Sequence, residues 1–220
     1  MSYTFDFSVV WREFDNLIQG LALDLLMATA SILMGAVIGV FVAFALVSKD
    51  RTKSKLAKFY VTLIRNTPIL IIILFVYFAL PDLGITLNQY QSFILALTVY
   101  AGAYIAEVLR GGIQALPKGT KESALAIGLT PNQTNRIIIL PIVIRSTLAS
   151  MSNNFISLFK DTSLAATIAV PELTFYTREI NVETFRVIEA WSVTSVLYVL
   201  TCLIIAVLLR RVEKRYAIIR

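Results

Sequence analysis

Residues 118–141 read KGTKESALAIGLTPNQTNRIIILP and form the longest polar interruption in the middle of an apolar sequence. The run Ala124 to Ile127 favours a short helix, and Gly128 offers the left-handed residue that commonly ends one. Thr130-Pro131-Asn132-Gln133 is a capping-box pattern with proline at the first helical position, so a second helix is predicted to begin there. The stretch therefore predicts a short helix, a tight turn and a new helix between two apolar segments.

Three short motifs follow one another along the chain: Arg65-Asn66-Thr67-Pro68, then Glu122-Ser123-Ala124 with Gly128 and Leu140-Pro141, then Lys160-Asp161-Thr162-Ser163-Leu164. The middle motif is similar to the EAA loop of ABC importer permeases. The other two resemble the polar amino-acid branch of that family. The three motifs have the family's order, and the resemblance covers nearly the whole chain.

The resemblance implies an all-α membrane protein with the fold of an ABC type I importer permease. In that family the EAA loop forms a cytoplasmic coupling helix, which docks into a cleft of a separate ATP-hydrolysing subunit. The matching residues here are Glu122, Ser123, Ala124, Leu125 and Gly128. Two positions depart from the family pattern, because Ser123 replaces the usual alanine and Asp24 replaces an uncharged residue.

The partners that the resemblance implies are ATP-binding-cassette ATPase subunits, a second permease chain and an extracytoplasmic amino-acid-binding protein. The second permease chain is either an identical copy or a sister chain. The sequence has no GxxxxGK[ST] motif, so it has no P-loop that cradles ATP phosphates. ATP and Mg²⁺ are therefore expected on the ATPase subunit. This chain is expected to hold no cofactor and no metal, and not to be an enzyme.

The composition is typical of a membrane protein. Of 220 residues, 57% are hydrophobic and only 15% are charged, whereas a soluble domain carries about 25% charge. The net charge of +6 could indicate nucleic-acid binding, but the basic residues gather in short loops between apolar segments. The single cysteine, Cys202, excludes an internal disulfide, and the absence of histidine excludes Ser-His-Asp and HExxH chemistry.

Five apolar segments are long enough to cross a bilayer, for which about 20 residues suffice. They comprise residues 25–47, 60–80, 92–109, 137–159 and 187–209, in one membrane domain spanning residues 1–220. The coupling loop, residues 117–136, separates the third span from the fourth. Gly35 and Gly39 form a GxxxG motif in the first span, which marks either a close helix contact or ordinary glycine use in membrane helices.

The distribution of Lys and Arg predicts the orientation in the membrane. Fourteen of them lie in residues 48–59, 110–136 and 210–220, against four in the N-terminal segment and residues 81–91 and 160–186. Cytoplasmic loops carry the excess of positive charge. We therefore expect a multi-pass protein of the bacterial cell membrane, with the N-terminus outside and the coupling loop and C-terminus in the cytoplasm.

Polar residues near the fourth span are candidates for the solute path. We expect Pro141 and the asparagines to break this span, and irregular backbone at membrane depth persists only where it lines a cavity. The candidates, in order, are Asn154, Thr162, Ser163 and Asn153 near this span, and then Arg65 and Glu107 of the second and third spans. The last two lie nearer the cytoplasmic end and are candidates for gate or structural charges. An alternative is a folded outer loop with a structural Lys160–Asp161 pair. Asp24, Glu107 and Glu189 are scattered among the spans, so no pair of acids is expected in one site.

The function predicted from these observations is that of a permease subunit, which forms the translocation path of an amino-acid importer and couples it to ATP hydrolysis. The alternative is a non-transporting interaction or regulatory subunit, whose cytoplasmic loop only anchors a cytosolic partner. A self-sufficient secondary transporter is a weaker third interpretation, because internal repeats and proton-relay acids are not evident. The sequence does not name the amino acid that is carried.

Overall fold

The computed structural model describes residues 3–216 and is 85% helical, with no strand among those residues. The α-helices are α1 Ser8–Arg12, α2 Phe14–Leu46, α3 Arg51–Arg65, α4 Ile69–Leu74, α5 Gln89–Gln114, α6 Lys118–Ala126, α7 Pro131–Gln133, α8 Leu140–Lys160, α9 Leu173–Thr184 and α10 Val187–Tyr216. Segments η1 Phe75–Ala79 and η3 Thr134–Ile139 are π-helical, and η2 Pro81–Leu83 and η4 Asp161–Ile168 are 3₁₀-helical. The all-α fold expected from the sequence is confirmed.

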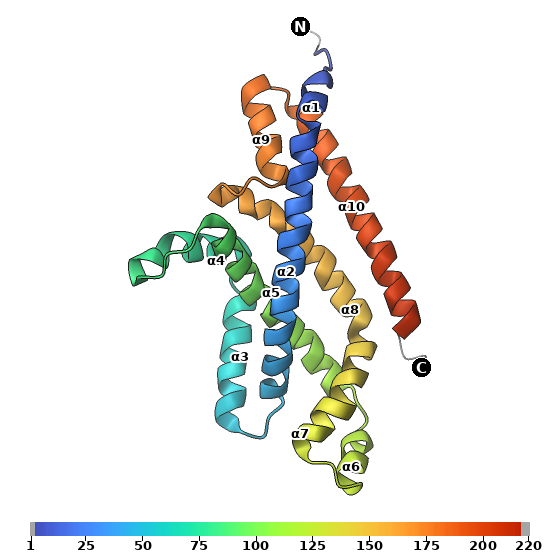
Figure 1. The fold of residues 1–220 in the computed structure, drawn as a ribbon. Coiled ribbons are helices and arrows are strands. Elements are labelled where there is room, and N and C mark those ends of the chain that lie inside the picture. The colour runs from blue at the N-terminus through green and yellow to red at the C-terminus, as the bar shows by residue number, and fades with distance from the viewer. Residues whose placement is uncertain (1–2, 217–220) are drawn as a thin grey trace.

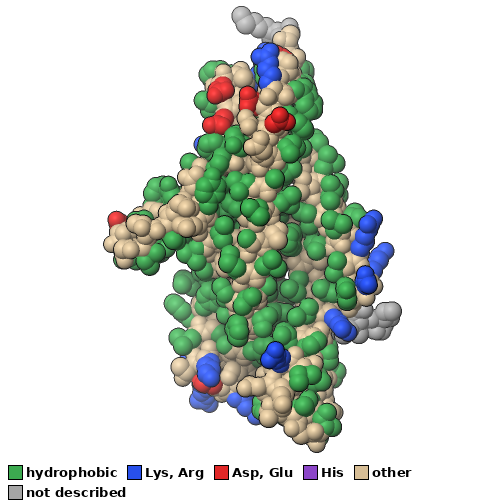
Figure 2. Space-filling model, in the orientation of Figure 1, with side chains coloured by type: hydrophobic (Ala, Val, Ile, Leu, Met, Phe, Trp, Pro, Cys, Tyr) green, Lys and Arg blue, Asp and Glu red, His purple; other side chains and the backbone are tan. Residues whose placement is uncertain are grey.

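Figure 1 shows an elongated bundle, with α1 and α9 at one end and α6 and α7 at the other. We call these the amino-terminal end and the elbow end. Figure 2 shows apolar side chains over the middle of the visible face, acidic residues gathered near the amino-terminal end, and Lys and Arg mainly toward the elbow end. A wide apolar band between two charged ends is the surface that a lipid bilayer requires.

Helices α2 and α5 form the centre of the bundle, and glycines allow them to approach closely. A Cβ on Gly35 would lie 2.7 Å from the Cβ of Ala101, and a Cβ on Gly39 would lie 2.8 Å from Cγ2 of Ile105. Small residues at such a contact permit tight packing of membrane helices. The GxxxG motif therefore marks a helix–helix contact, the first of the two interpretations above.

The expected second span, residues 60–80, is not one straight helix. Helix α3 ends at Arg65, and the helical segment Ile69–Ala79 then leaves at an angle of 102°. Pro68 explains the break, because it has no N–H to continue the helix and disfavours helical backbone at the residue before it. Four helical segments are individually long and apolar enough to span a membrane, or up to five if this bent pair is counted as one span.

The fourth span differs from the second, because the breaks expected in it are absent. A single candidate span runs through residues 131–168. Pro141 directly follows the π-helical segment η3, so the local change in hydrogen-bond pattern accommodates a residue without an N–H inside the continuing helix. Asn153 and Asn154 are ordinary residues inside α8. The prediction that these asparagines interrupt the helix was wrong.

Other helices, of which α2 and α5 are examples, are longer than the apolar segments that predicted them. Helix α2 begins at Phe14, eleven residues before the first expected span, and α5 extends from Gln89 to Gln114 rather than over residues 92–109. The start of α5 has a local cause. The Asn88 side chain accepts a hydrogen bond from the Gln91 N–H, and the Gln91 side chain accepts one from the Asn88 N–H.

Candidate functional site

The elbow, residues 117–136, has a backbone that its own sequence explains. At the end of α6 the Gly128 N–H donates to the Leu125 carbonyl at 3.0 Å, and the Leu129 N–H donates to the Ala124 carbonyl at 3.2 Å. This pair of bonds is a Schellman motif, which requires left-handed backbone at the glycine. Gly128 has φ +93°, as the sequence predicted.

The second half of the elbow begins with the expected capping box. The Gln133 N–H donates to Oγ1 of Thr130 at 3.3 Å, and the Thr130 N–H donates to Oε1 of Gln133 at 2.9 Å. Pro131 occupies the first turn of α7, where its missing N–H leaves no bond unmade. Local hydrogen bonds therefore determine the angle between α6 and the helix that leads to α8.

The exposed apolar side chains of the elbow are only partly those that the sequence indicated. Ala124 is only 4% exposed and faces inward, so it does not form part of an accessible docking surface. Leu125 and Ile127 are 41% and 77% exposed and project from the surface, while Glu122 and Ser123 are exposed polar residues beside them. Ile127 was missed because the family motif does not include it.

A groove of about 710 Å³ lies between the elbow and the neighbouring ends of α2 and α5. Its lining includes Lys49 after α2, Lys118, Lys121 and Glu122 of α6, and Leu125. The elbow end thus presents an apolar protrusion, a small helix with mixed charge and an adjacent groove.

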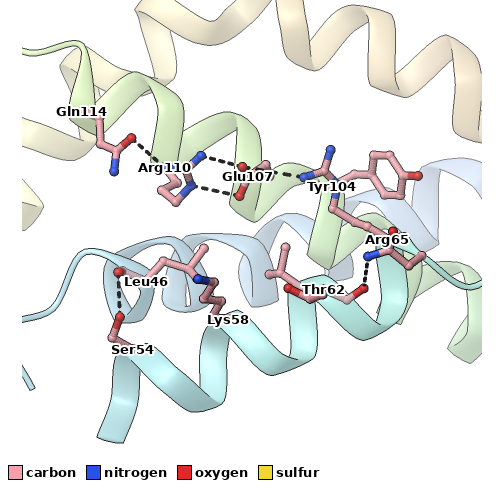
Figure 3. Close-up of a pocket in the computed structure, with 11 residues that line it drawn as sticks. Leu46, Ser54, Lys58, Thr62, Arg65, Tyr104, Glu107, Arg110 and Gln114 are labelled. Atoms are coloured by element: carbon pink, nitrogen blue, oxygen red, sulfur yellow. Dashed lines mark hydrogen bonds and ion pairs between the residues drawn. The ribbon is translucent and has the colours of Figure 1, made fainter. Parts of the chain in front are cut away.

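A second, polar cavity of about 590 Å³ lies between α3 and α5 (Figure 3). Glu107 accepts two hydrogen bonds from Arg110, at 2.9 Å to Nε and 2.5 Å to Nη2. Arg65 lies on the other wall, with Nη1 3.7 Å from Oε1 of Glu107 and its guanidinium over the ring of Tyr104. The structure therefore brings together Arg65 and Glu107, two of the six path candidates.

The charges in this polar cavity do not balance. Glu107 is one carboxylate between two guanidinium groups, and the side chain of Arg65 remains 40% exposed. The longer Arg65–Glu107 contact leaves donors of Arg65 free for a further acceptor such as a carboxylate. Arg65 is the last residue of α3, immediately before the bend at Asn66-Thr67-Pro68.

The other four path candidates lie elsewhere. Asn154 lines a separate, mainly apolar cavity of about 200 Å³ between α8 and α10, and its amide nitrogen is buried without a hydrogen-bond partner. Asn153 is exposed. Thr162 is fully buried and donates to the Phe159 carbonyl at 2.7 Å, and Ser163 donates to the Lys160 carbonyl at 2.8 Å. Within this one chain the six residues do not form a single site.

The fold and these surfaces define a class of protein. An all-helical chain with several membrane-type helices, a polar cavity beside a bent helix and an exposed elbow is a multi-pass membrane protein. Among the described residues no group of three or more Cys, Asp or Glu side chains could hold a metal ion.

The comparisons with known proteins identify the family within this class. Residues 35–218 match the family model described as "Binding-protein-dependent transport system inner membrane component", so the chain belongs to that family. The glutamine transport system permease protein GlnP of Escherichia coli strain K12 is 36% identical over 219 residues, which cover 98% of this chain and 99% of that protein. The probable amino-acid ABC transporter permease protein YckA of Bacillus subtilis strain 168 is 35% identical, over 98% of this chain and 95% of that one.

Solved structures agree with the family assignment. A structure described as an amino acid ABC transporter with histidines superposes with a TM-score of 0.87 and 29% identity, over 97% of this chain and 100% of that chain. The MetNI methionine ABC transporter, in an inward-facing form, has a TM-score of 0.82 at 20% identity and supports the fold alone. The chain is thus an ABC transporter permease of the amino-acid type, a multi-pass membrane protein rather than an enzyme.

Proposed function

We propose that this chain forms the translocation path of an ATP-driven amino-acid importer and couples it to a separate ATPase subunit. The observation that carries the proposal is the elbow, whose capped backbone holds Leu125 and Ile127 exposed next to a groove. A rigid, capped helix with protruding apolar side chains can transmit a push from a docked protein into α5 and α8. ATP and Mg²⁺ would then be bound by the partner, because this sequence has no phosphate-binding loop of its own.

The elbow faces the cytoplasm in this proposal, and the N-terminus lies outside. The excess of Lys and Arg in residues 48–59, 110–136 and 210–220 supports this orientation. Single cysteines in place of Thr120 and Asn88, in a Cys202→Ser background, should react with an impermeant thiol reagent from opposite faces of the membrane. Labelling of the Thr120 position from outside intact cells would reverse the proposed orientation.

The solute is a polar amino acid, and glutamine is the first candidate to test. Support comes from the relatives, whose names refer to glutamine transport at 36% identity, cystine transport at 32% and arginine transport at 26%. An extracytoplasmic binding protein would deliver the amino acid, as the family description implies. Arg65 carries unused donors that suit the carboxylate of an amino acid, so we place it at the cytoplasmic end of the path.

The path itself lies between two permease chains. One chain offers too few spans to enclose a solute, and the six path candidates do not meet within it. Asn154 has a buried amide nitrogen without a partner, which a second chain or a passing solute would satisfy. Asn153 is exposed and the hydroxyl of Ser163 is partly accessible, so both remain candidates for contact across such an interface.

The deciding experiment is co-purification followed by transport. The chain, produced with an affinity tag in its native host, should bring an ATP-binding-cassette ATPase with it from detergent. Reconstituted vesicles containing that complex and the binding protein should take up labelled glutamine when ATP is enclosed with the ATPase. A stable complex with the ATPase that moves none of the amino acids tested, while a sister importer does so under the same conditions, would instead indicate an anchoring subunit.

A further inference from the structure

A pair of buried carboxyl groups lies at the amino-terminal end of the bundle, far from the elbow. Glu172 caps the start of α9, where its Oε2 accepts the Thr174 N–H at 2.8 Å and its Oε1 accepts the Phe175 N–H at 2.9 Å. The Glu172 side chain is fully buried. Both of its oxygens therefore receive backbone donors at a helix N-terminus, the position that best stabilises a negative charge.

Asp24 of α2 faces Glu172, because α2 packs directly against the backbone at the start of α9. A Cβ on Gly20, one turn before Asp24, would lie 2.6 Å from the Glu172 carbonyl carbon and from the Leu173 nitrogen. Asp24 is fully buried, and its Oδ2 accepts the Leu173 N–H in a long bond of 3.4 Å. Its other oxygen, Oδ1, is buried and has no hydrogen-bond partner. An acceptor left in this way is costly.

The two carboxyl groups share one hydroxyl. The Tyr198 oxygen of α10 lies 3.2 Å from Oδ2 of Asp24, 3.3 Å from Oε2 of Glu172 and 3.2 Å from Oγ1 of Thr174. A tyrosine hydroxyl has one hydrogen and can donate to only one carboxylate. If both acids were ionised, one carboxylate would face the lone pairs of the Tyr198 oxygen.

No cation compensates for the two acids. Among the described residues, neither Asp24 nor Glu172 forms a salt bridge with Lys or Arg. The other titratable side chains on the surrounding elements make no hydrogen bond or ion pair to the two acids. They are Asp15 on α2, Arg145 and Lys160 on α8, Asp161 on η4, Tyr176, Arg178, Glu179 and Glu183 on α9, and Glu189, Cys202, Arg210, Arg211, Glu213, Lys214, Arg215 and Tyr216 on α10. Two uncompensated charges buried side by side would strongly destabilise the fold.

We propose that Asp24 and Glu172 form a proton-binding site that holds one proton between two carboxyl groups. Glu172 is the anion, because two backbone N–H groups hold its oxygens. Asp24 carries the proton and donates it to the Tyr198 oxygen, and the Tyr198 hydroxyl in turn donates to Glu172. The arrangement reduces the negative charge of the site from two to one. It also gives the O–H groups of Asp24 and Tyr198 one acceptor each.

The proton would join α2, α9 and α10 at this end of the permease. Its loss would place a second negative charge against Glu172 and separate α2 from the start of α9. The fold then requires the protonated form, so the stability contributed by the site is present at low pH and is lost as the pH rises and the proton leaves. The site therefore makes the amino-terminal end sensitive to pH, without contact with the transported amino acid.

Infrared spectroscopy of the full 220-residue chain in detergent tests the proposal, because a protonated carboxyl has a C=O stretching band that a carboxylate lacks. We expect this band in the parent at neutral pH and its loss in Asp24→Asn. Asn at position 24 mimics the protonated acid, since its amide N–H can donate as the acid O–H does. Glu189→Gln is the matched control. Glu189 is also fully buried, but Arg186 compensates its charge, so the band should remain.

Thermal unfolding supplies a second measurement. The melting temperature of the parent should fall by at least about 3 °C as the pH rises from about 6 to about 9, the range in which buried acids can release a proton. Asp24→Asn should not show this fall. If Asp24→Asn does not fold, Tyr198→Phe serves instead, because it keeps both acids and should shift the band by removing its hydrogen-bond partner.

Absence of the band from the parent across this pH range would overturn the proposal. So would a band of equal size in the parent and Asp24→Asn, or one that disappears in Glu189→Gln alone. For Tyr198→Phe, a band at the parent's frequency would show that the proton is not held at this hydroxyl. None of these measurements depends on uptake, so they decide the question whatever solute the importer carries.

Discussion

The two ends of the molecule hold their key residues in opposite ways. At the elbow end, Gly128, Thr130 and Gln133 are exposed, and each acts on neighbours within five positions of the sequence. At the amino-terminal end, Asp24, Glu172 and Tyr198 come from three helices and lie up to 174 positions apart. The elbow is a local structure that is accessible to a partner. The carboxyl pair is a tertiary structure that exists only when the helices pack.

The difference between the two ends predicts which property a substitution at each end should change. A change at the elbow leaves the bundle intact and should affect what docks there, because few contacts inside the chain depend on these exposed side chains. A change at the carboxyl pair should affect the bundle first and transport second. The predictions below test this division, in order of the size of the expected effect.

The largest effect is expected from Gly20→Val. The added side chain would meet the backbone of Glu172 and Leu173 at 2.6 Å, and backbone cannot turn away as a flexible side chain can. Overpacking of this kind costs about 1–3 kcal/mol, and more where backbone must shift. We expect the variant to insert poorly or to melt at least about 5 °C lower than the parent, measured by thermal unfolding in detergent.

Gly111→Ala is the matched control for this substitution. Gly111 lies inside α5 toward the elbow end, and a Cβ there would meet nothing within 4 Å. Alanine should therefore stabilise α5 by about 0.5–1 kcal/mol. Equal melting temperatures for Gly20→Val and the parent would contradict the close contact between α2 and the start of α9.

The second prediction concerns Gly128→Asp at the elbow. Aspartate adopts left-handed backbone more readily than most non-glycine residues, so the substitution should cost the fold little. The new side chain would project into open space, since no atom of the chain lies within 4 Å of a Cβ there. We expect normal insertion and melting, but weaker association with the ATPase and loss of ATP-driven uptake.

Gly128→Asn distinguishes the effect of the negative charge from that of the backbone conformation at the same position. Asparagine also tolerates left-handed backbone, but it carries no charge. It should retain part of the uptake. A Gly128→Asp chain that transports like the parent would remove the elbow from the coupling mechanism.

The third prediction concerns the polar cavity. Glu107→Gln leaves Arg65 and Arg110 without their shared carboxylate, and a hydrogen bond to a charged group contributes about 1.5–3 kcal/mol. The cavity is partly exposed, so solvent should screen much of this loss and leave folding nearly unchanged. We expect uptake to fall about tenfold with the ATPase still bound. Lys53→Ala is the control, because its exposed ion pair with Asp50 lies outside the cavity.

The contrast between the two ends also explains what the sequence could predict. Gly128 at φ +93° and the Thr130–Gln133 cap follow from a few neighbouring residues, and both were predicted. The bend of 102° at Pro68 was missed because apolar character continues across it, although Pro68 itself was the signal. The pairing of Asp24 with Glu172 was missed because it depends on how α2 packs against α9. The departure of Asp24 from the family pattern indicated this position, but the sequence did not show that Glu172 is its partner.

The smallest effect on uptake is expected from substitution of Asn154. This residue belongs to the bundle, yet its buried amide nitrogen has no hydrogen-bond partner among residues 3–216. If a second permease chain or the solute supplies that partner, Asn154→Ala should reduce uptake severalfold in vesicles that contain the whole transporter, because a lost neutral hydrogen bond is worth about 0.5–1.5 kcal/mol.

Asn154→Leu distinguishes this role from a purely structural one. Its side chain has a similar size, suits the apolar cavity around residue 154 and removes the unsatisfied donor. The isolated chain should therefore keep or slightly raise its melting temperature, while uptake by the assembled transporter should fall as it does for Asn154→Ala. Parent-like uptake by both variants would place Asn154 in the scaffold and leave selectivity to the external binding protein. Asn154 would then contribute only to the folded bundle, as the carboxyl pair does.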